Sequence, residues 1–253
     1  MKSQNLLTIP TPVFRFAFLL FTSLLISFSS ILAKPKVLVF TKTAGFYHQS
    51  IEPGKIAIMK LGQEKGFTVD TTSNADWFKK ENLKRYAAVI FLNTTGDVLN
   101  PAQEKAFEHY IQSGGGFVGV HSAADTEYDW EWYGKLVGAY FLSHPKQQEA
   151  RLNILDNSHV STQHLPEFWM HFDEWYNFKN LSSKTTILIA IDENSYQGGK
   201  NGDDHPMAWY QNFDGGRAFY TGLGHTDEDY SDPLFLKHLL GGIQFAIGKR
   251  KIK

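Results

Sequence analysis

The chain has 253 residues, and its 25 Lys and Arg residues nearly balance its 26 Asp and Glu residues, for a formal net charge of −1. This balance gives no support for nucleic-acid binding, which needs a strongly basic surface. The chain contains no cysteine, which excludes disulfides and thiol chemistry.

Residues 1–33 have the pattern of a secretory signal peptide. A basic Lys2 precedes an apolar run over residues 16–28, and the small residue Ala33 ends the segment. The apolar run is short for a membrane span, which favours cleavage near Ala33 over retention as an anchor. We therefore expect residues 34–253 to form one domain of a periplasmic or secreted protein, which meets a membrane only through its export signal.

The first half of this domain alternates short apolar runs with helical segments. Strands are predicted over residues 37–40, 67–70 and 87–93 and in the run that ends at residue 120. Helices are predicted over residues 53–65 and 101–112, with a short helix or loop over residues 76–83. Alternation of this kind predicts an α/β fold whose parallel sheet carries helices on both faces.

The second half has a different pattern. Four further strands are predicted over residues 150–155, 185–192, 207–213 and 217–222. The last two flank Asp214-Gly215-Gly216, a turn typical of a hairpin. An apolar helix over residues 233–248 ends the domain, so the second half is expected to extend the sheet of the first.

The most informative segment is Gly-Gly-Gly-Phe-Val-Gly-Val-His-Ser-Ala-Ala-Asp at residues 114–125. Small residues let the backbone turn sharply at a strand end, where many α/β hydrolases and amidotransferases place a nucleophilic serine or cysteine. Here that position holds His121, which predicts an active site without thiol chemistry. The glycines precede the strand instead of opening a helix, so we expect no nucleotide cofactor.

Three more histidines lie in loops at predicted strand ends. His48 follows the first strand, so it should share an edge of the parallel sheet with His121. His205 precedes one arm of the hairpin and His225 follows the other, which predicts that these two side chains are neighbours. If the hairpin end coincides with the edge that carries His121, all four histidines converge.

Carboxylates complete the set of candidate catalytic residues. Asp173 and Glu174 lie among aromatic residues, where a buried charge needs a partner. Glu174 and Asp125 are the acidic candidates, and burial is expected to raise the pKa of either toward the range of a general acid or base.

A group of imidazoles with one carboxylate also suits zinc or a similar divalent metal. The candidate metal ligands are His48, His121, His205 and His225, although no His-x-x-x-His or comparable local spacing supports them. The histidines interpreted as ordinary hydrogen-bonding residues are His109, His144, His159, His164 and His238. His171 is left open. Ser122 is an alternative nucleophile, but no Gly-x-Ser-x-Gly pattern surrounds it.

The sequence resembles the trehalose-utilisation (ThuA-like) family within the class I glutamine amidotransferase-like fold. The matching segments are residues 46–50, 115–122, 173–176, 205–209 and 222–225. The resemblance implies a flavodoxin-like three-layer sandwich with a mostly parallel central sheet and an added C-terminal antiparallel hairpin. It also implies a role in carbohydrate metabolism, with keto-sugars as substrates. True amidotransferases carry cysteine where this chain has His121, so a cysteine-dependent glutaminase is excluded.

We therefore expect an exported enzyme that acts on a sugar or keto-sugar glycoside. Proton abstraction beside a carbonyl would lead to elimination, isomerisation or cleavage, as in a lyase, isomerase or hydrolase. His121 or Glu174 would be the base, and the other histidines would polarise an oxygen directly or through a metal. The residues assigned to substrate contacts are Tyr47, Ser122, Trp175 and Trp209.

Two alternatives remain open at this point. A non-catalytic carbohydrate-binding domain would use Trp175, Trp209 and Tyr176 as stacking surfaces. A serine hydrolase would use Ser122 with a neighbouring histidine as base.

Overall fold

One large sheet organises the fold. The computed structural model describes residues 33–248, so the predicted signal peptide lies outside the described residues apart from Ala33. The strands of this sheet, in chain order, are β1 (Lys36–Phe40), β2 (Thr68–Thr72), β3 (Ala88–Leu92), β4 (Gly116–Val120), β6 (Gln148–Ile154), β7 (Phe168–Asp173), β9 (Thr186–Ile191), β10 (Pro206–Phe213) and β11 (Gly216–Thr221).

The order of these strands is β2-β1-β3-β4-β11-β10-β9-β6-β7. Neighbours from β2 to β11 pair in parallel, whereas β10, β9, β6 and β7 add to the sheet in antiparallel pairs. A small separate sheet pairs β5 (Tyr140–Ser143) with β8 (Asn177–Lys179). The predicted hairpin is thus the beginning of a larger antiparallel extension.

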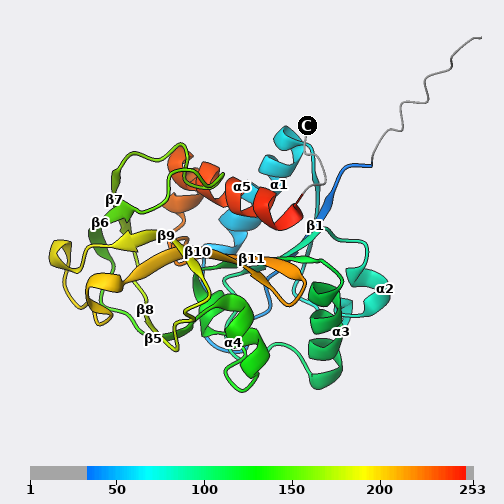
Figure 1. The fold of residues 1–253 in the computed structure, drawn as a ribbon. Helices are drawn as coiled ribbons and strands as arrows, with labels where there is room; N and C mark the ends of the chain where they lie inside the picture. Colours follow the sequence, from blue (N-terminus) through cyan, green and yellow to red (C-terminus); the bar gives the residue numbers. More distant parts are fainter. Residues whose placement is uncertain (1–32, 249–253) are drawn as a thin grey trace, which may run out of the picture. The chain divides into compact units, whose positions relative to one another are not determined.

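Helices cover both faces of the sheet. They are α1 (Ile51–Lys65), α2 (Lys80–Leu83), α3 (Pro101–Gln112), α4 (Glu131–Val137) and α5 (Pro233–Ile247). Figure 1 shows α1 and α5 on one face and α3 and α4 on the other. This arrangement confirms the predicted three-layer α/β fold. None of the helices within residues 33–248 is long and apolar enough to cross a membrane.

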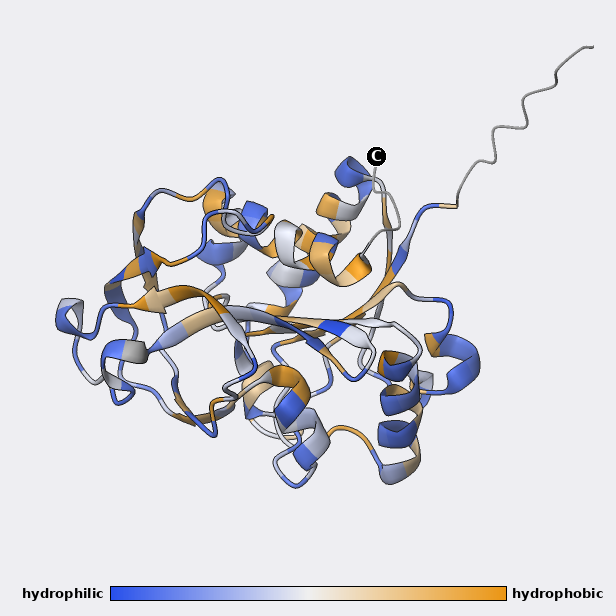
Figure 2. Ribbon diagram, in the orientation of Figure 1, coloured by the Kyte–Doolittle hydropathy of each residue, from blue (hydrophilic) through white to orange (hydrophobic). Residues whose placement is uncertain are grey.

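The central strands are buried because both faces are covered. All five residues of β3, Ala-Val-Ile-Phe-Leu, lie in the core, as do those of β4. Figure 2 shows the same concentration of apolar residues along the middle of the sheet and on α5. Continuous apolar runs of this kind are typical of parallel strands, which have no solvent-exposed face.

Local signals explain where the helices begin. At the start of α3, the Asn100 side chain accepts hydrogen bonds from the backbone N–H groups of Ala102 and Gln103. The Gln103 side chain in turn accepts from the Asn100 N–H, which completes a capping box. Asp232 caps α5 by accepting from the N–H of Leu234. Both helices have proline at their first position, where the missing N–H has no intrahelical partner to lose.

The elements predicted from sequence are present with boundaries that differ by a few residues, but α4, β5, β7 and β8 were not predicted. In β7 the buried face carries Trp169, His171 and Asp173, whereas Phe168, Met170 and Phe172 are exposed. Two polar residues inside and three apolar residues outside depart from the usual alternation of apolar inside and polar outside, so the strand has no ordinary sequence signal. The polar residues on its inner face belong to the candidate site.

Close packing of α5 on β11 gives a test of the core. A Cβ added at Gly242 would lie 2.2 Å from the ring of Phe219, which is fully buried. Gly242→Ala should lower the free energy of unfolding by about 1–3 kcal/mol, although alanine favours a helix over glycine by roughly 1 kcal/mol. Urea denaturation measures the effect, with the exposed Gln63→Ala on α1 as the control. A more stable Gly242→Ala variant would contradict this packing.

Candidate metal centre

Parallel pairing brings the strand ends of the candidate site to one edge of the sheet. Val120, the last residue of β4, pairs with Leu92 of β3 on one side and with Thr221 of β11 on the other. Residues that directly follow these strands therefore lie side by side. They include His121 after β4 and the segment 222–225 after β11, while the loop after β1 leads to His48.

His121 is held in a strained backbone conformation at its strand end. Its φ of +48° lies in the left-handed region, which is uncommon for residues other than glycine and is often found at functional sites. The carbonyl of His121 accepts a hydrogen bond from the Tyr220 hydroxyl at 2.7 Å. The ring Nδ1 lies 2.9 Å from the carbonyl oxygen of Gly222, so Nδ1 carries the proton and Nε2 presents a lone pair.

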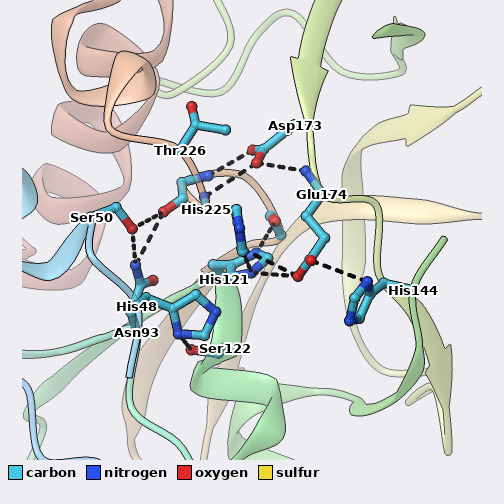
Figure 3. A network of polar contacts seen from close by, with 12 residues as sticks. His48, Ser50, Asn93, His121, Ser122, His144, Asp173, Glu174, His225 and Thr226 are labelled. Atoms are coloured by element: carbon cyan, nitrogen blue, oxygen red, sulfur yellow. Dashed lines mark hydrogen bonds and ion pairs between the residues drawn. The ribbon is translucent and has the colours of Figure 1, made fainter. Parts of the chain in front are cut away.

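Four side chains form what we call the donor cluster: His48, His121, Glu174 and His225. One nitrogen or carboxylate oxygen from each lies within 4.8 Å of the others. His121 Nε2 is 3.1 Å from His225 Nδ1, and Glu174 Oε2 is 3.4 Å from the first nitrogen and 3.2 Å from the second. The His48 ring lies 5.1 Å, between centroids, from each of the other two imidazoles. Figure 3 shows these side chains converging.

Burial sets the charges in the donor cluster. It lowers the pKa of His48 to about 2, with further lowering by His121 and His225. Burial also lowers the pKa of His121, which is fully enclosed. For Glu174 burial acts to raise the pKa, but contacts with His121 and His225 outweigh it and lower the pKa. The raised pKa expected for Glu174 is therefore wrong, because the imidazoles stabilise its ionised form.

This geometry fits a bound divalent metal. Neutral imidazoles and an ionised carboxylate are the protonation states in which these groups bind metals. Ligands placed tetrahedrally at zinc bond lengths of about 2.0–2.1 Å are roughly 3.3 Å apart. The separations of 3.1–3.4 Å among His121, His225 and Glu174 match that spacing. The carbonyl of Gly222 supplies the outer hydrogen bond that metal-binding histidines usually make.

Asp173 holds two of the ligand-bearing segments together. Its Oδ1 accepts hydrogen bonds from the backbone N–H groups of Glu174, at 2.8 Å, and His225, at 3.2 Å, and Oδ2 accepts from Gly224 at 2.9 Å. Burial raises the pKa of Asp173, and the nearby Asp229 raises it further. Through its three hydrogen bonds, the Asp173 carboxyl group fixes the backbone of Glu174 on one side of the donor cluster and that of Gly224 and His225 on the other.

The Gly224 carbonyl is fixed as firmly as its N–H. It accepts hydrogen bonds from Ser50 Oγ at 3.3 Å, from Asn93 Nδ2 at 3.1 Å and from the Tyr230 hydroxyl at 3.1 Å. Figure 3 shows Ser50 and Asn93 contacting the segment after β11 from the side of the parallel strands. The peptide next to His225 is thereby attached to the segments that follow β1 and β3.

The structure does not bring His205 into the donor cluster. Its Nδ1 lies 2.8 Å from Glu193 Oε1 and its Nε2 lies 2.7 Å from the carbonyl oxygen of Tyr176. Both ring nitrogens are thus engaged within a buried structural network. The predicted convergence of four histidines is wrong for His205, because the loop between β9 and β10 turns this ring toward Glu193 and away from the donor cluster.

The two tryptophans assigned to substrate contacts are core residues. Trp175 is 0% exposed and donates its indole N–H to the carbonyl of Gln148, and Trp209 is 1% exposed and donates to that of Val137. Tyr176 is also buried, with its ring 4.2 Å from that of His121. None of these rings presents a face to a ligand, which corrects the prediction of stacking surfaces at these positions.

The other predicted site residues lie around the donor cluster. Tyr47 is half exposed beside a pocket described below. Ser122 is fully buried, with Oγ 3.4 Å from His48 Nδ1. Asp125 accepts a hydrogen bond from the Tyr128 hydroxyl, and burial raises its pKa as expected. Asp125 is not among the residues of the donor cluster.

Two histidines that the sequence did not single out contact the site. His144 Nδ1 lies 3.1 Å from Glu174 Oε1, on the side of the carboxylate that faces away from His121. His171 Nε2 lies 2.7 Å from Asp229 Oδ1, and these two residues form a second donor group with Asp173. The proximity of His171 to Glu174 in the sequence is a signal that could have identified it, whereas nothing in the sequence marks His144.

A pocket of about 920 Å³ opens over the donor cluster. His48 and His225 line it, together with His171 and Asp229 of the second group. This volume lies within the range of pockets that hold small molecules. Two members of the donor cluster, His48 and His225, can therefore contact a ligand of the size of a sugar.

Comparison with known proteins identifies the family. The ThuA family model, described as trehalose utilisation, matches residues 36–246. The chain belongs to the ThuA family. No curated protein matches this ThuA-family sequence.

Solved structures with low sequence identity share the ThuA-family fold. A ThuA-like protein from Bacteroides uniformis is 24% identical with a TM-score of 0.75, over 88% of this chain and 95% of that chain. One from Parabacteroides merdae is 21% identical with a TM-score of 0.71, over 87% and 92%. A β-galactosidase from Bacillus circulans is 11% identical with a TM-score of 0.56, over 83% of this chain and 31% of its own.

The role of Asp173 in the ThuA-family site can be tested by metal binding. In Asp173→Asn one acceptor oxygen becomes an NH2 group, so at least one backbone N–H of the ligand-bearing segments loses its acceptor. Zinc affinity should fall by about 10- to 100-fold, as measured by competition with a chromophoric chelator. The exposed Asp129→Asn is the matched control. Unchanged affinity in Asp173→Asn would contradict the positioning role.

Proposed function

We propose that this protein is an exported, metal-dependent enzyme that acts on a sugar or keto-sugar glycoside. The observation that carries the proposal is the donor cluster, in which three imidazoles and one carboxylate lie within 4.8 Å of one another beside an open pocket. The family description, trehalose utilisation, supports a carbohydrate as the substrate class. The pattern of residues 1–33 supports export.

His48, His121, His225 and Glu174 would hold the ion. A divalent ion in this position supplies Lewis-acid polarisation of a substrate oxygen and can activate a bound water. The lowered pKa values of His48 and His121 keep these rings neutral, so their lone pairs stay available at neutral pH. With the ion held by these residues, the site would stabilise negative charge that develops on an oxygen next to the reacting carbon.

Glu174 is better placed than His121 to move a proton. Both nitrogens of His121 are committed, with Nδ1 bonded to Gly222 and Nε2 directed into the donor cluster. Glu174 directs Oε2 at the donor cluster and Oε1 at His144, whose side chain is 43% exposed. A proton taken from beside a carbonyl would pass from Glu174 Oε1 through His144 to solvent, because the lowered pKa of Glu174 disfavours keeping the proton on this carboxylate.

Removal of one metal-binding side chain should abolish the reaction without unfolding the protein. His121→Ala should bind zinc at least about 100-fold more weakly and should abolish turnover of a keto-glycoside, while its circular dichroism spectrum stays unchanged. The dependence of turnover on the metal is also tested by metal analysis of the purified protein, which should contain a divalent ion, and by chelator treatment, which should abolish turnover. Full turnover in His121→Ala would contradict the assignment. Sugar binding without any catalysed change would instead support the non-catalytic binding domain.

The contact between Ser122 Oγ and His48 Nδ1 favours a serine hydrolase as the second candidate. Because Ser122 is fully buried and His48 belongs to the donor cluster, we expect Ser122→Ala to retain turnover within about threefold, a change of less than 1 kcal/mol in the barrier. Labelling of the wild-type protein by a fluorophosphonate probe, lost in Ser122→Ala together with activity, would support the hydrolase instead.

A further inference from the structure

The pocket beside the donor cluster has an unusual combination of side chains. Phe46 and Tyr47 line it next to His48, and four carboxylates line it after His225. These acidic residues are Asp227, Glu228, Asp229 and Asp232. No lysine or arginine occurs among the described residues that line the pocket. The approach to the donor cluster is therefore aromatic and negatively charged.

The two aromatic side chains are exposed, although the backbone at Phe46 is held by hydrogen bonds. Phe46 is 67% exposed and Tyr47 is 52% exposed. The Thr95 hydroxyl donates a hydrogen bond to the carbonyl of Phe46 at 2.8 Å, and the Ala44 N–H donates to the carbonyl of Thr95 at 2.7 Å. The rings of Phe46 and His48 are nearly perpendicular and pack edge to face, with their centroids 4.9 Å apart. These contacts hold the Phe46 ring at the pocket beside His48, and Tyr47, which lies between them in the chain, also lines the pocket.

The carboxylates differ in how far they are already engaged. Asp229 contacts His171 and accepts from the N–H and hydroxyl of Thr226, and Asp232 caps α5. Asp227 and Glu228, which we call the acidic rim, are exposed and form no ion pair within residues 33–248. Their charges act on whatever enters the pocket.

We propose that the pocket selects uncharged sugars, with Phe46 and Tyr47 as the stacking surface and the acidic rim as a filter against phosphorylated and acidic sugars. The proposal rests on the proposed function and narrows its substrate class. The C–H face of a pyranose packs on an aromatic ring, whose face carries partial negative charge. Sugar hydroxyls donate hydrogen bonds to carboxylates, whereas a phosphate or carboxylate on the sugar is repelled by them.

Charge selection can be tested by calorimetry on the zinc-loaded protein, with trehalose and sucrose and with the 6-phosphate of each as probes. The neutral sugars should bind at least about tenfold more tightly than their phosphates. The double variant Asp227→Asn/Glu228→Gln should bind the phosphates about tenfold more tightly than wild type does, with less than a twofold change for the neutral sugars. Glu64→Gln/Glu81→Gln, exposed on α1 and α2, makes the same charge change elsewhere and should leave all four affinities unchanged.

Stacking is tested by Phe46→Ala and Tyr47→Ala, each of which should weaken binding of the neutral sugars by about three- to tenfold. Tyr47→Phe keeps the ring and should retain wild-type affinity. Phe168→Ala removes an aromatic ring of similar exposure on β7, outside the pocket, and should have no effect.

The outcomes separate this proposal from the one on which it rests. Equal or tighter binding of the phosphates by wild type, or no gain in the acidic-rim variant, would overturn the charge filter while leaving a sugar-binding enzyme intact. Unchanged affinity in both alanine variants would overturn the stacking surface. Failure of all four sugars to bind the zinc-loaded protein would overturn this inference, and absence of turnover of a keto-glycoside as well would overturn the proposed function.

Discussion

The carboxyl group of Asp173 joins the two segments on which the donor cluster depends. It accepts hydrogen bonds from the N–H groups of Glu174, Gly224 and His225, and so it fixes the end of β7 against the turn after β11. These strands lie four positions apart in the sheet, with β7 at its edge. Without this acceptor, the buried N–H groups of Glu174 and Gly224 would lack partners, which is costly.

The other two members of the donor cluster also follow parallel strands of the sheet. His121 follows β4 and His48 lies in the loop after β1, so both are placed by strands buried on both faces. The donor cluster is thus assembled from a rigid parallel layer and from an antiparallel extension that Asp173 ties to it. Ligands carried by well-packed elements keep their spacing, which is the condition for binding a metal with defined geometry.

Burial explains the charges as well as the positions. The rings of His48 and His121 are withdrawn from water, which disfavours their protonated forms. Contacts with His121 and His225 stabilise the ionised form of Glu174, contrary to the expectation from burial alone. The prediction of a raised pKa assumed that Glu174 lies in apolar surroundings, whereas in the folded chain its carboxylate contacts His121, His225 and His144.

The predictions from sequence succeeded where the signal was local. Apolar runs, prolines and glycines marked the parallel strands and their helices, and small residues at a strand end singled out His121. The hairpin argument placed His225 correctly, because β11 pairs in parallel with β4. It failed for His205, whose ring direction depends on Glu193 and the carbonyl of Tyr176. No pattern in the sequence records such a contact.

The sequence by itself determined the α/β alternation, the strand-end position of His121 and the absence of thiol chemistry. Only the tertiary structure decided that Trp175 and Trp209 are core residues, that His144 contacts Glu174, and that Asp173 holds the site together. The physical reason is the range of the interactions involved. Backbone propensity and hydrophobic periodicity act between near neighbours in the chain, whereas burial, hydrogen-bond partners and pKa values depend on groups that only folding brings together.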